Sequence, residues 1–203
     1  MKIYEMKIAP NPRRVRIFLA EKAIEGVEFI ELDLQNGENL TAEFKQKNPF
    51  AKVPVLELDD GQCISETVAI CRYFEESHPK NPLMGETPIE KANIEMWQRR
   101  IEFFFFLPTG MCFQHTSGYF KDRMNPIKEW GEECRTQIQK FMHMLNKHLE
   151  NSRYIAGDKF SIADITALCT IDFNRVNRID IGEEQLYLQR WYNEISSRPS
   201  AKA

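Results

Sequence analysis

The sequence predicts a small α/β domain followed by an all-helical domain, and three observations support this prediction. Short apolar runs typical of strands occur only in the first part of the chain. Two of these runs are joined by Asp60-Gly61, which is a strong hairpin signal. After a proline-rich linker, apolar residues recur only at helical spacing. We therefore expect an α/β domain over residues 1–77, a linker over 78–88 and a helical domain over 89–203.

The elements of the first domain alternate between strand and helix patterns. Pro12 is well placed at the start of a helix, where its missing N–H costs nothing. Apolar residues occupy both faces of the second strand, as in a covered and partly parallel sheet. The predicted order is βαβαββα, with a strand over 2–8, a helix from Pro12 to Gly26, a strand over 27–34, a helix over 40–46, two strands flanking the hairpin, and a helix that opens at Ser65-Glu66-Thr67 and continues through Phe74.

Two features of this domain predict a binding site for a short anionic peptide. Pro54 cannot donate to a sheet ladder, so Val53-Pro54 should lie at the start or the edge of a strand, with a cis bond as one option. The backbone groups of Val53 would then be free to pair with a molecule outside the protein. The polar helix start at Glu66-Thr67 offers a hydroxyl and unpaired N–H groups, which attract a carboxylate.

The second domain contains only helix patterns. Ser161 and Asp164 have the spacing of a capping box with Asp in the place of Glu or Gln, so we interpret them as folding determinants rather than site residues. The predicted helices cover residues 89–106, 130–149, 161–171 and 187–196.

Composition excludes several function classes. The five cysteines are scattered and form no CxxC pair, which argues for reduced thiols and against a zinc site. Neither part of the chain is basic and the net charge is −3, so we expect no nucleic-acid partner. No signal peptide or membrane span is visible, and we expect a cytoplasmic protein with no membrane partner.

Four motifs, in this order and spacing, resemble those of the cytosolic glutathione S-transferase family over essentially the whole chain. They are the proline-containing turn before Arg14-Val15-Arg16-Ile17, Lys52-Val53-Pro54 after Asn48-Pro49, Glu66-Thr67, and Tyr154-Ile155-Ala156-Gly157-Asp158 before Ser161 and Asp164. The resemblance implies a thioredoxin-like first domain that binds glutathione and a helical second domain that forms the wall for a hydrophobic co-substrate. It also implies a homodimer. From the scattered cysteines we expect no metal.

The resemblance assigns roles to individual residues. Val53 matches the residue whose main chain pairs with the cysteinyl part of glutathione, and Pro54 matches the family's cis-proline. Glu66 and Thr67 match the residues that hold the γ-glutamyl end, Lys52 matches a lysine that reaches the glycyl carboxylate, and Phe50 matches an aromatic that inserts into the partner subunit. Each has a plainer interpretation: helix-start chemistry for Glu66 and Thr67, an ordinary exposed lysine, and a phenylalanine that packs under its own loop.

The chain departs from the family where the sulfur reacts. Many classes place Tyr, Ser or Cys at the turn between the first strand and the first helix, but here that position is Ala9. The pattern Ala9-Pro10-Asn11 resembles the Thr-Pro-Asn turn of bacterial Nu-type enzymes without its threonine. We therefore expect the Asn11 side chain to donate a hydrogen bond to the thiolate, the alternative being that Asn11 only fills a turn. Tyr4 lies a few positions too early for this role.

The co-substrate pocket is harder to predict because aromatic residues at helical spacing are also typical of a core. The candidates are Trp97, Arg100, Phe104, Phe113 and His115. Two functions stay open. One is an enzyme that uses the glutathione thiolate to attack a small hydrophobic electrophile or a disulfide. The other is a non-catalytic binding or scaffold module, which Ala9 favours and which the retained Lys52, Glu66 and Thr67 oppose.

Overall fold

The computed structural model describes all residues 1–203, which divide into two compact units. The first unit is Met1–Leu83 with Pro199–Ala203, and the second is Met84–Arg198. The sequence assigned the last five residues to the helical domain, but they pack on the first unit as a short 3-10 helix, Pro199–Lys202. Arg13 Nη2 donates to the carbonyl oxygen of Ala201 at 2.9 Å.

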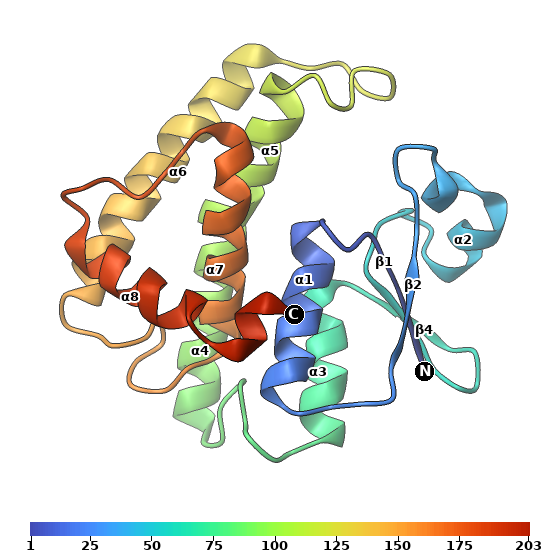
Figure 1. Ribbon diagram of the computed structural model, residues 1–203, viewed down its shortest axis with the longest axis horizontal. Coiled ribbons are helices and arrows are strands. Elements are labelled where there is room, and N and C mark those ends of the chain that lie inside the picture. The colour runs from blue at the N-terminus through green and yellow to red at the C-terminus, as the bar shows by residue number, and fades with distance from the viewer. The chain divides into compact units, whose positions relative to one another are not determined.

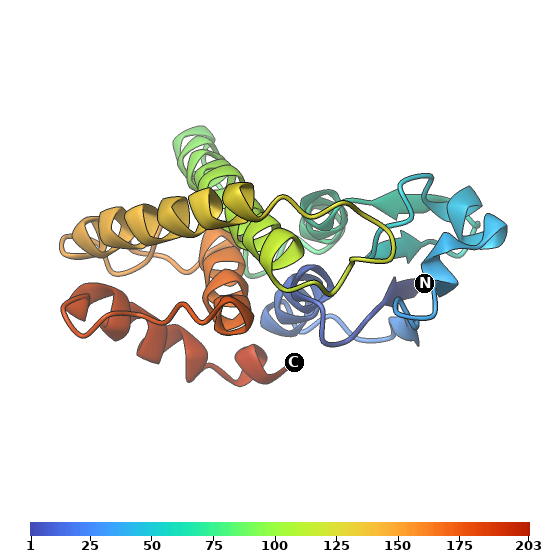
Figure 2. The same cartoon turned by 90° about the horizontal axis from the view of Figure 1, so that it is seen from above.

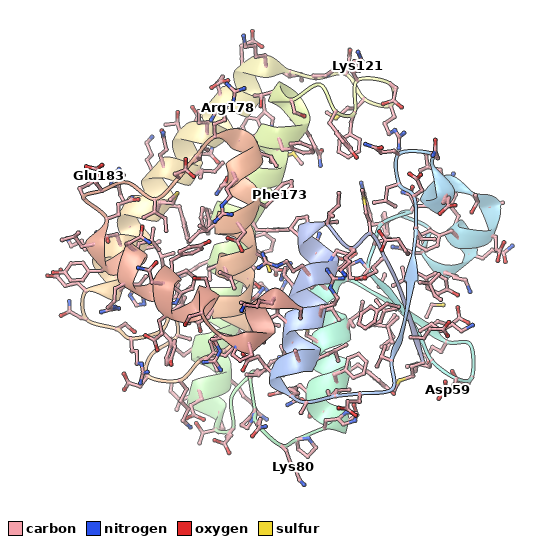
Figure 3. The ribbon with its side chains drawn as sticks, in the orientation of Figure 1. Asp59, Lys80, Lys121, Phe173, Arg178 and Glu183 are labelled. Carbon is pink, nitrogen blue, oxygen red and sulfur yellow. The ribbon has the colours of Figure 1, made fainter.

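The first unit contains a four-stranded mixed sheet with strand order β2-β1-β3-β4. Its strands are β1 (Lys2–Glu5), β2 (Glu28–Glu31), β3 (Val55–Glu57) and β4 (Cys63–Ser65). The β1 strand pairs parallel with β2 and antiparallel with β3, and β3 pairs antiparallel with β4. Asp59 lies in the hairpin between β3 and β4 (Figure 3), where its carboxylate binds the N-terminal ammonium at 2.6 Å.

Three helices cover this sheet (Figures 1 and 2): α1 (Pro10–Glu21), α2 (Ala42–Lys47) and α3 (Thr67–Ser77). The α1 and α3 helices lie side by side on one face, and α2 lies on the other, where Phe44 meets the ring of Tyr4. A one-turn 3-10 helix, Glu38–Leu40, precedes α2. The core between the sheet and the α1–α3 layer includes Ile3, Val15, Phe18, Leu56, Ile70 and Phe74, all of them fully buried.

The predicted order βαβαββα is confirmed, although the first two strands and α1 are shorter than the sequence suggested. The α1 helix begins at Pro10, two residues before the predicted start, so Pro12 is its third residue. This is still a tolerated position, because the N–H groups of the first turn have no partner within the helix. The first two strands span four residues each, and residues 6–9 form the turn that connects β1 to α1.

A buried ion pair fixes α1 to α3 and to the segment that follows. Lys22 Nζ lies 2.7 Å from Glu75 Oε2 and also donates to the carbonyl oxygens of Lys80 and Asn81. The other carboxylate oxygen of Glu75 accepts from the N–H of Leu83. All three ammonium protons therefore have acceptors, which offsets the cost of burying the charges.

The second unit is entirely helical. Its helices are α4 (Pro88–Ile101), α5 (Leu107–Thr116), α6 (Lys128–Leu149), α7 (Ile162–Asn174) and α8 (Leu186–Ser196), with a 3-10 turn at Arg175–Asn177. The long α6 helix packs along α5, and α4 packs on α7 (Figure 2). None of these helices is long and apolar enough to cross a membrane.

The first long helix of this unit differs from the prediction. We expected one helix over 89–106, but the helical path continues to Thr116 through a π-helical turn, Glu102–Phe106. Four consecutive helical residues point in different directions, and of these four phenylalanines only Phe105 is fully buried, where it stacks on Phe141 at 5.1 Å. Phe103 and Phe104 are more than half exposed.

Candidate functional site

The turn that enters α1 leaves few backbone donors. Pro10 and Pro12 have no N–H, and the N–H of Arg13 donates to the carbonyl oxygen of Ala9 at 3.3 Å. Asn11 is therefore the one residue of the first turn whose backbone N–H is without an acceptor in the chain. Ala9 contributes no side-chain cap. Any anion held at this helix end would meet Asn11 first.

The side chain of Asn11 has a defined orientation. Its Oδ1 accepts from Arg14 Nη1 at 2.9 Å and from Thr67 Oγ1 at 3.3 Å. A guanidinium can only donate, so the atom of the amide that faces Arg14 is the oxygen. The NH2 group of Asn11 then points away from Arg14 and donates to no acceptor of the chain. The half-buried amide thus offers two protons to a neighbouring group.

The start of α3 lies beside this turn. Asn11 is the second residue of α1 and Thr67 the first residue of α3, so the hydrogen bond between their side chains joins the N-termini of two helices. Each N-terminus carries roughly half a positive charge from its peptide dipoles. The two helix ends together form a positive region with a hydroxyl and a primary amide in it.

The residue before α3 has an unusual backbone. Glu66 has φ +71° and ψ 119°, a region that non-glycine residues rarely occupy, and its exposed side chain makes no capping hydrogen bond. The N–H groups of Thr67, Val68 and Ala69 are consequently left without intrachain acceptors, because the first helical bond runs from Ile70 to Glu66. Backbone outliers of this kind cost on the order of 1–3 kcal/mol and gather at functional sites.

The segment before β3 presents an unpaired backbone. The Val53–Pro54 peptide bond is cis, and the N–H and C=O groups of Val53 take part in no hydrogen bond of the chain. Two amides hold this segment in place: Asn48 Nδ2 donates to the carbonyl oxygen of Lys52 at 2.9 Å, and Asn39 Nδ2 donates to that of Ala51 at 2.7 Å. The expected free edge at Val53 is therefore present.

Other predicted residues of the first unit are exposed or committed elsewhere. Lys52 is exposed, and the Phe50 side chain is 75% exposed, so Phe50 does not pack under its own loop. The Tyr4 hydroxyl donates to Glu57 Oε2 at 2.8 Å, and burial together with this carboxylate raises the pKa of Tyr4. Lys47 binds the same carboxylate and lies over the Tyr4 ring, so the tyrosine is already engaged within the first unit.

The five co-substrate candidates lie in different surroundings within the second unit. Trp97 is buried and stacks on His148 at a centroid distance of 4.1 Å, with the Arg100 guanidinium over its ring at 4.8 Å. Phe104 lies within the π turn and is 62% exposed. Trp97 is accordingly a core residue, which is the plainer of its two interpretations.

The remaining two candidates belong to the end of α5. Phe113 packs against Phe173 of α7 (labelled in Figure 3) at 5.3 Å and against Tyr119 at 5.4 Å. His115 Nδ1 accepts from the N–H of Ile127 at 2.9 Å, which ties together the two ends of the α5–α6 connection. Phe113 is therefore part of an aromatic cluster, but no ring contact connects this cluster to Trp97.

Sequence reasoning missed three residues that organise the site. Arg14, Asn39 and Asn48 fix Asn11 and the segment before β3. Arg14 lies three residues after Asn11, a spacing that places two side chains on one helix face and could have been noticed. No group of three or more His, Cys, Asp and Glu side chains is placed to hold a metal ion.

Comparison with known proteins identifies the family. The model of the glutathione S-transferase N-terminal domain matches residues 8–77, and the model of the C-terminal domain matches residues 110–199. Glutathione S-transferase 2 of Saccharomyces cerevisiae is 38% identical over 205 residues, which cover all of this chain and 88% of the yeast protein. The chain belongs to the glutathione S-transferase family.

Structural comparison agrees with this membership. The crystal structure of Gtt2 from S. cerevisiae superimposes with a TM-score of 0.94 at 39% identity, covering 100% of this chain and 99% of that one. A rice protein, elongation factor 1-gamma 1, is 30% identical over 169 residues, which cover 81% of this chain but only 38% of the rice protein. The predicted family, the fold class and the prediction of a glutathione transferase are confirmed.

Proposed function

We propose that this glutathione transferase binds glutathione in its first unit and uses the bound thiolate to attack an electrophilic carbon or a disulfide. The observation that carries the proposal is the hydrogen bond between Thr67 and Asn11, which brings two helix N-termini together. A tripeptide with an anionic end and a thiol needs such a pair of positive ends, one for each.

The binding part of the proposal assigns one protein group to each part of glutathione. The free N–H and C=O of Val53 pair with the cysteinyl residue in the manner of an added strand. The open N-terminus of α3 and the hydroxyl of Thr67 bind the γ-glutamyl carboxylate, and Glu66 binds the neighbouring ammonium group. Lys52 binds the glycyl carboxylate. The exposed position of Lys52 and Glu66 suits groups that meet a ligand from solution.

The chemical part concerns the thiol. Its pKa is about 8.5 in water, and lowering it by two units requires roughly 2.7 kcal/mol of preferential stabilisation of the thiolate. A hydrogen bond from the Asn11 amide to a charged sulfur contributes about 1.5–3 kcal/mol. The dipole of α1 adds about 0.3–1 kcal/mol. These contributions together are of the required size without a hydroxyl at Ala9.

The reaction then follows from the nucleophilic sulfur. The thiol proton leaves to water, and the thiolate forms a bond to the electrophilic carbon while the leaving group departs with its electron pair. With a small disulfide, the thiolate bonds to one sulfur and the other leaves as a thiolate, which gives a mixed disulfide with glutathione. No cysteine of the protein is needed in either reaction.

The proposal is tested by purified protein with glutathione and either an aryl halide or a small disulfide. We expect binding of glutathione by calorimetry and turnover of at least one co-substrate. In Asn11→Ala, the midpoint of the pH–rate profile should rise by one to two units while glutathione still binds. An unchanged profile would remove Asn11 from the reaction.

A non-catalytic binding module is the competing function, and Ala9 is the observation that favours it. Such a module has no physical need for the open helix end at Thr67 or for the free backbone of Val53. Calorimetry separates the two functions, because a scaffold should give no heat with glutathione at millimolar concentration.

The partner and the co-substrate wall remain parts of this proposal. The 75% exposure of Phe50 suits insertion into a second copy of the chain, so Phe50→Ser should lower the mass measured by sedimentation if the protein is a homodimer.

The exposed aromatic side chains of the second unit, above all Phe104, are proposed to contact a hydrophobic co-substrate. Phe104→Ala should then raise KM for an aryl halide and leave KM for glutathione unchanged.

A further inference from the structure

We infer that Arg14 is a positioning residue for the reaction: its guanidinium fixes the Asn11 amide so that the NH2 group faces the glutathione sulfur. This inference rests on the proposed function and adds a residue to it. Arg14 itself reaches the reacting atoms only through Asn11.

The geometry of Arg14 suits this role. Arg14 is 2% exposed, and its guanidinium Nη1 lies 2.9 Å from Asn11 Oδ1. Both residues are in α1, three positions apart, so the helix itself sets the distance between them. A buried guanidinium has few alternative conformations, and its planar donors hold a fixed direction. The amide of Asn11 is therefore oriented by a rigid donor.

Orientation of this amide decides its effect on the sulfur. A primary amide has an oxygen that accepts and a nitrogen that donates, and a rotation of half a turn exchanges them. The nitrogen end stabilises a thiolate, whereas the oxygen end repels it. Arg14 makes the second orientation costly, because the guanidinium would then face the NH2 group donor to donor.

Thr67 cannot replace Arg14 in this role. Its hydroxyl has a single proton, which in this structure is donated to Asn11 Oδ1 at 3.3 Å. In the proposed complex the same hydroxyl binds the γ-glutamyl carboxylate, a charged and therefore stronger acceptor. Once glutathione is bound, Arg14 is the donor that continues to orient Asn11. Its positive charge also polarises the amide and strengthens the N–H donors at the far end.

The test measures the pKa of the glutathione thiol in the complex from the ultraviolet absorbance of the thiolate against pH. The proteins are the wild type, Asn11→Ala, Arg14→Met, Arg14→Lys and the double variant Arg14→Met/Asn11→Ala. Arg14→Met should raise the thiol pKa by about one unit or more, close to the shift in Asn11→Ala. The double variant should shift no further than Asn11→Ala alone, because Arg14 acts through Asn11.

The outcomes separate the two proposals. If Asn11→Ala shifts the thiol pKa and Arg14→Met does not, Arg14 is only structural and the proposed reaction stands. If Asn11→Ala produces no shift, the proposed role of Asn11 fails first. Additive shifts in the double variant would overturn the claim that Arg14 acts through Asn11. Arg14→Lys, which keeps the charge and a donor, covers the case in which Arg14→Met fails to fold, and it should shift the pKa less than Asn11→Ala does. In Arg14→Lys, a shift of the thiol pKa as large as that in Asn11→Ala would contradict the inference.

Discussion

The N-termini of α7 and α3 differ in whether side chains of the protein cap them. At the start of α7, the buried carboxylate of Asp164 accepts from the N–H and hydroxyl of Ser161, the N–H of Ile155 and the indole N–H of Trp191. At the start of α3, Glu66 makes no capping bond, and three N–H groups of the first turn have no acceptor in the chain.

The difference separates a folding device from a binding device. Burial raises the pKa of Asp164 to about 6, while the four donors act in the opposite direction, and each carboxylate oxygen accepts from two of them. A cap that is already complete has nothing to offer a ligand. The open end of α3 destabilises the helix slightly. A carboxylate that binds there can accept the hydrogen bonds for which the chain has no acceptor.

The largest expected effect is the loss of the α7 cap. Asp164→Ala should lower the free energy of unfolding by at least about 3 kcal/mol, because four buried donors lose their acceptor and each unsatisfied group costs roughly 1–3 kcal/mol. Denaturant titration followed by circular dichroism measures this loss.

Glu66→Ala at the other helix start is the matched control. Its side chain makes no capping bond, and alanine meets the same backbone conformation as glutamate, so we expect a change below about 0.5 kcal/mol. Equal losses in the two variants would mean that the open cap of α3 also contributes to folding.

Thr67 should show the converse behaviour, with a large effect on binding. Thr67→Val keeps the shape of the side chain and removes the hydroxyl, so glutathione should bind about 10- to 100-fold more weakly, as expected for a lost hydrogen bond to a charged group. Calorimetric titration gives the dissociation constant, and Thr67→Ser should retain most of the affinity. Loss of affinity in the serine variant as well would shift the explanation from the hydroxyl to packing.

Glycine at position 66 should raise the stability of the fold and weaken glutathione binding. Glu66 has φ +71°, which glycine adopts without steric cost, so Glu66→Gly should raise the free energy of unfolding by about 1 kcal/mol. The same change removes the proposed partner of the glutathione ammonium group and should weaken glutathione binding. A variant that is both less stable and fully able to bind would contradict both halves of this prediction.

Much of the first unit could be predicted from sequence because its signals are local. Proline and glycine mark the turns between elements, so the order βαβαββα can be predicted from neighbouring residues. The free backbone of Val53 follows in the same way from Pro54. The cap formed by Ser161 and Asp164 is local in the same way, since its two residues are three positions apart.

The contacts between distant residues could not be predicted. Thr67 meets Asn11 across 56 positions, and no local pattern sets the phase of one helix against another. Helical periodicity likewise does not reveal the π turn at Glu102–Phe106, in which Phe104 is exposed. The hydrogen bond from Arg13 to Ala201 joins residues 188 positions apart, and no local pattern indicates such a contact.

The start of α4 offers the smallest and most specific test of the comparison, because its cap is complete but exposed. Glu90 accepts from Lys159 and from the N–H groups of Thr87 and Glu86, and these donors, Lys159 first, lower its pKa to about 2. A carboxyl whose pKa is lower in the folded state than its ordinary value of 4.5 stabilises the fold above pH 4.5. That contribution should be lost as the pH falls from about 4.5 towards 2.

Glu90→Gln should remove this dependence. Melting temperatures measured from pH 6 to pH 2 should fall less steeply in the variant than in the wild type, with the two curves converging at the acid end. Because the cap is exposed, water replaces part of each lost hydrogen bond and the effect should stay well below that of Asp164→Ala. Parallel curves over the whole range would show that a complete cap at the surface contributes nothing that depends on the charge of Glu90, and burial would then be what distinguishes α7.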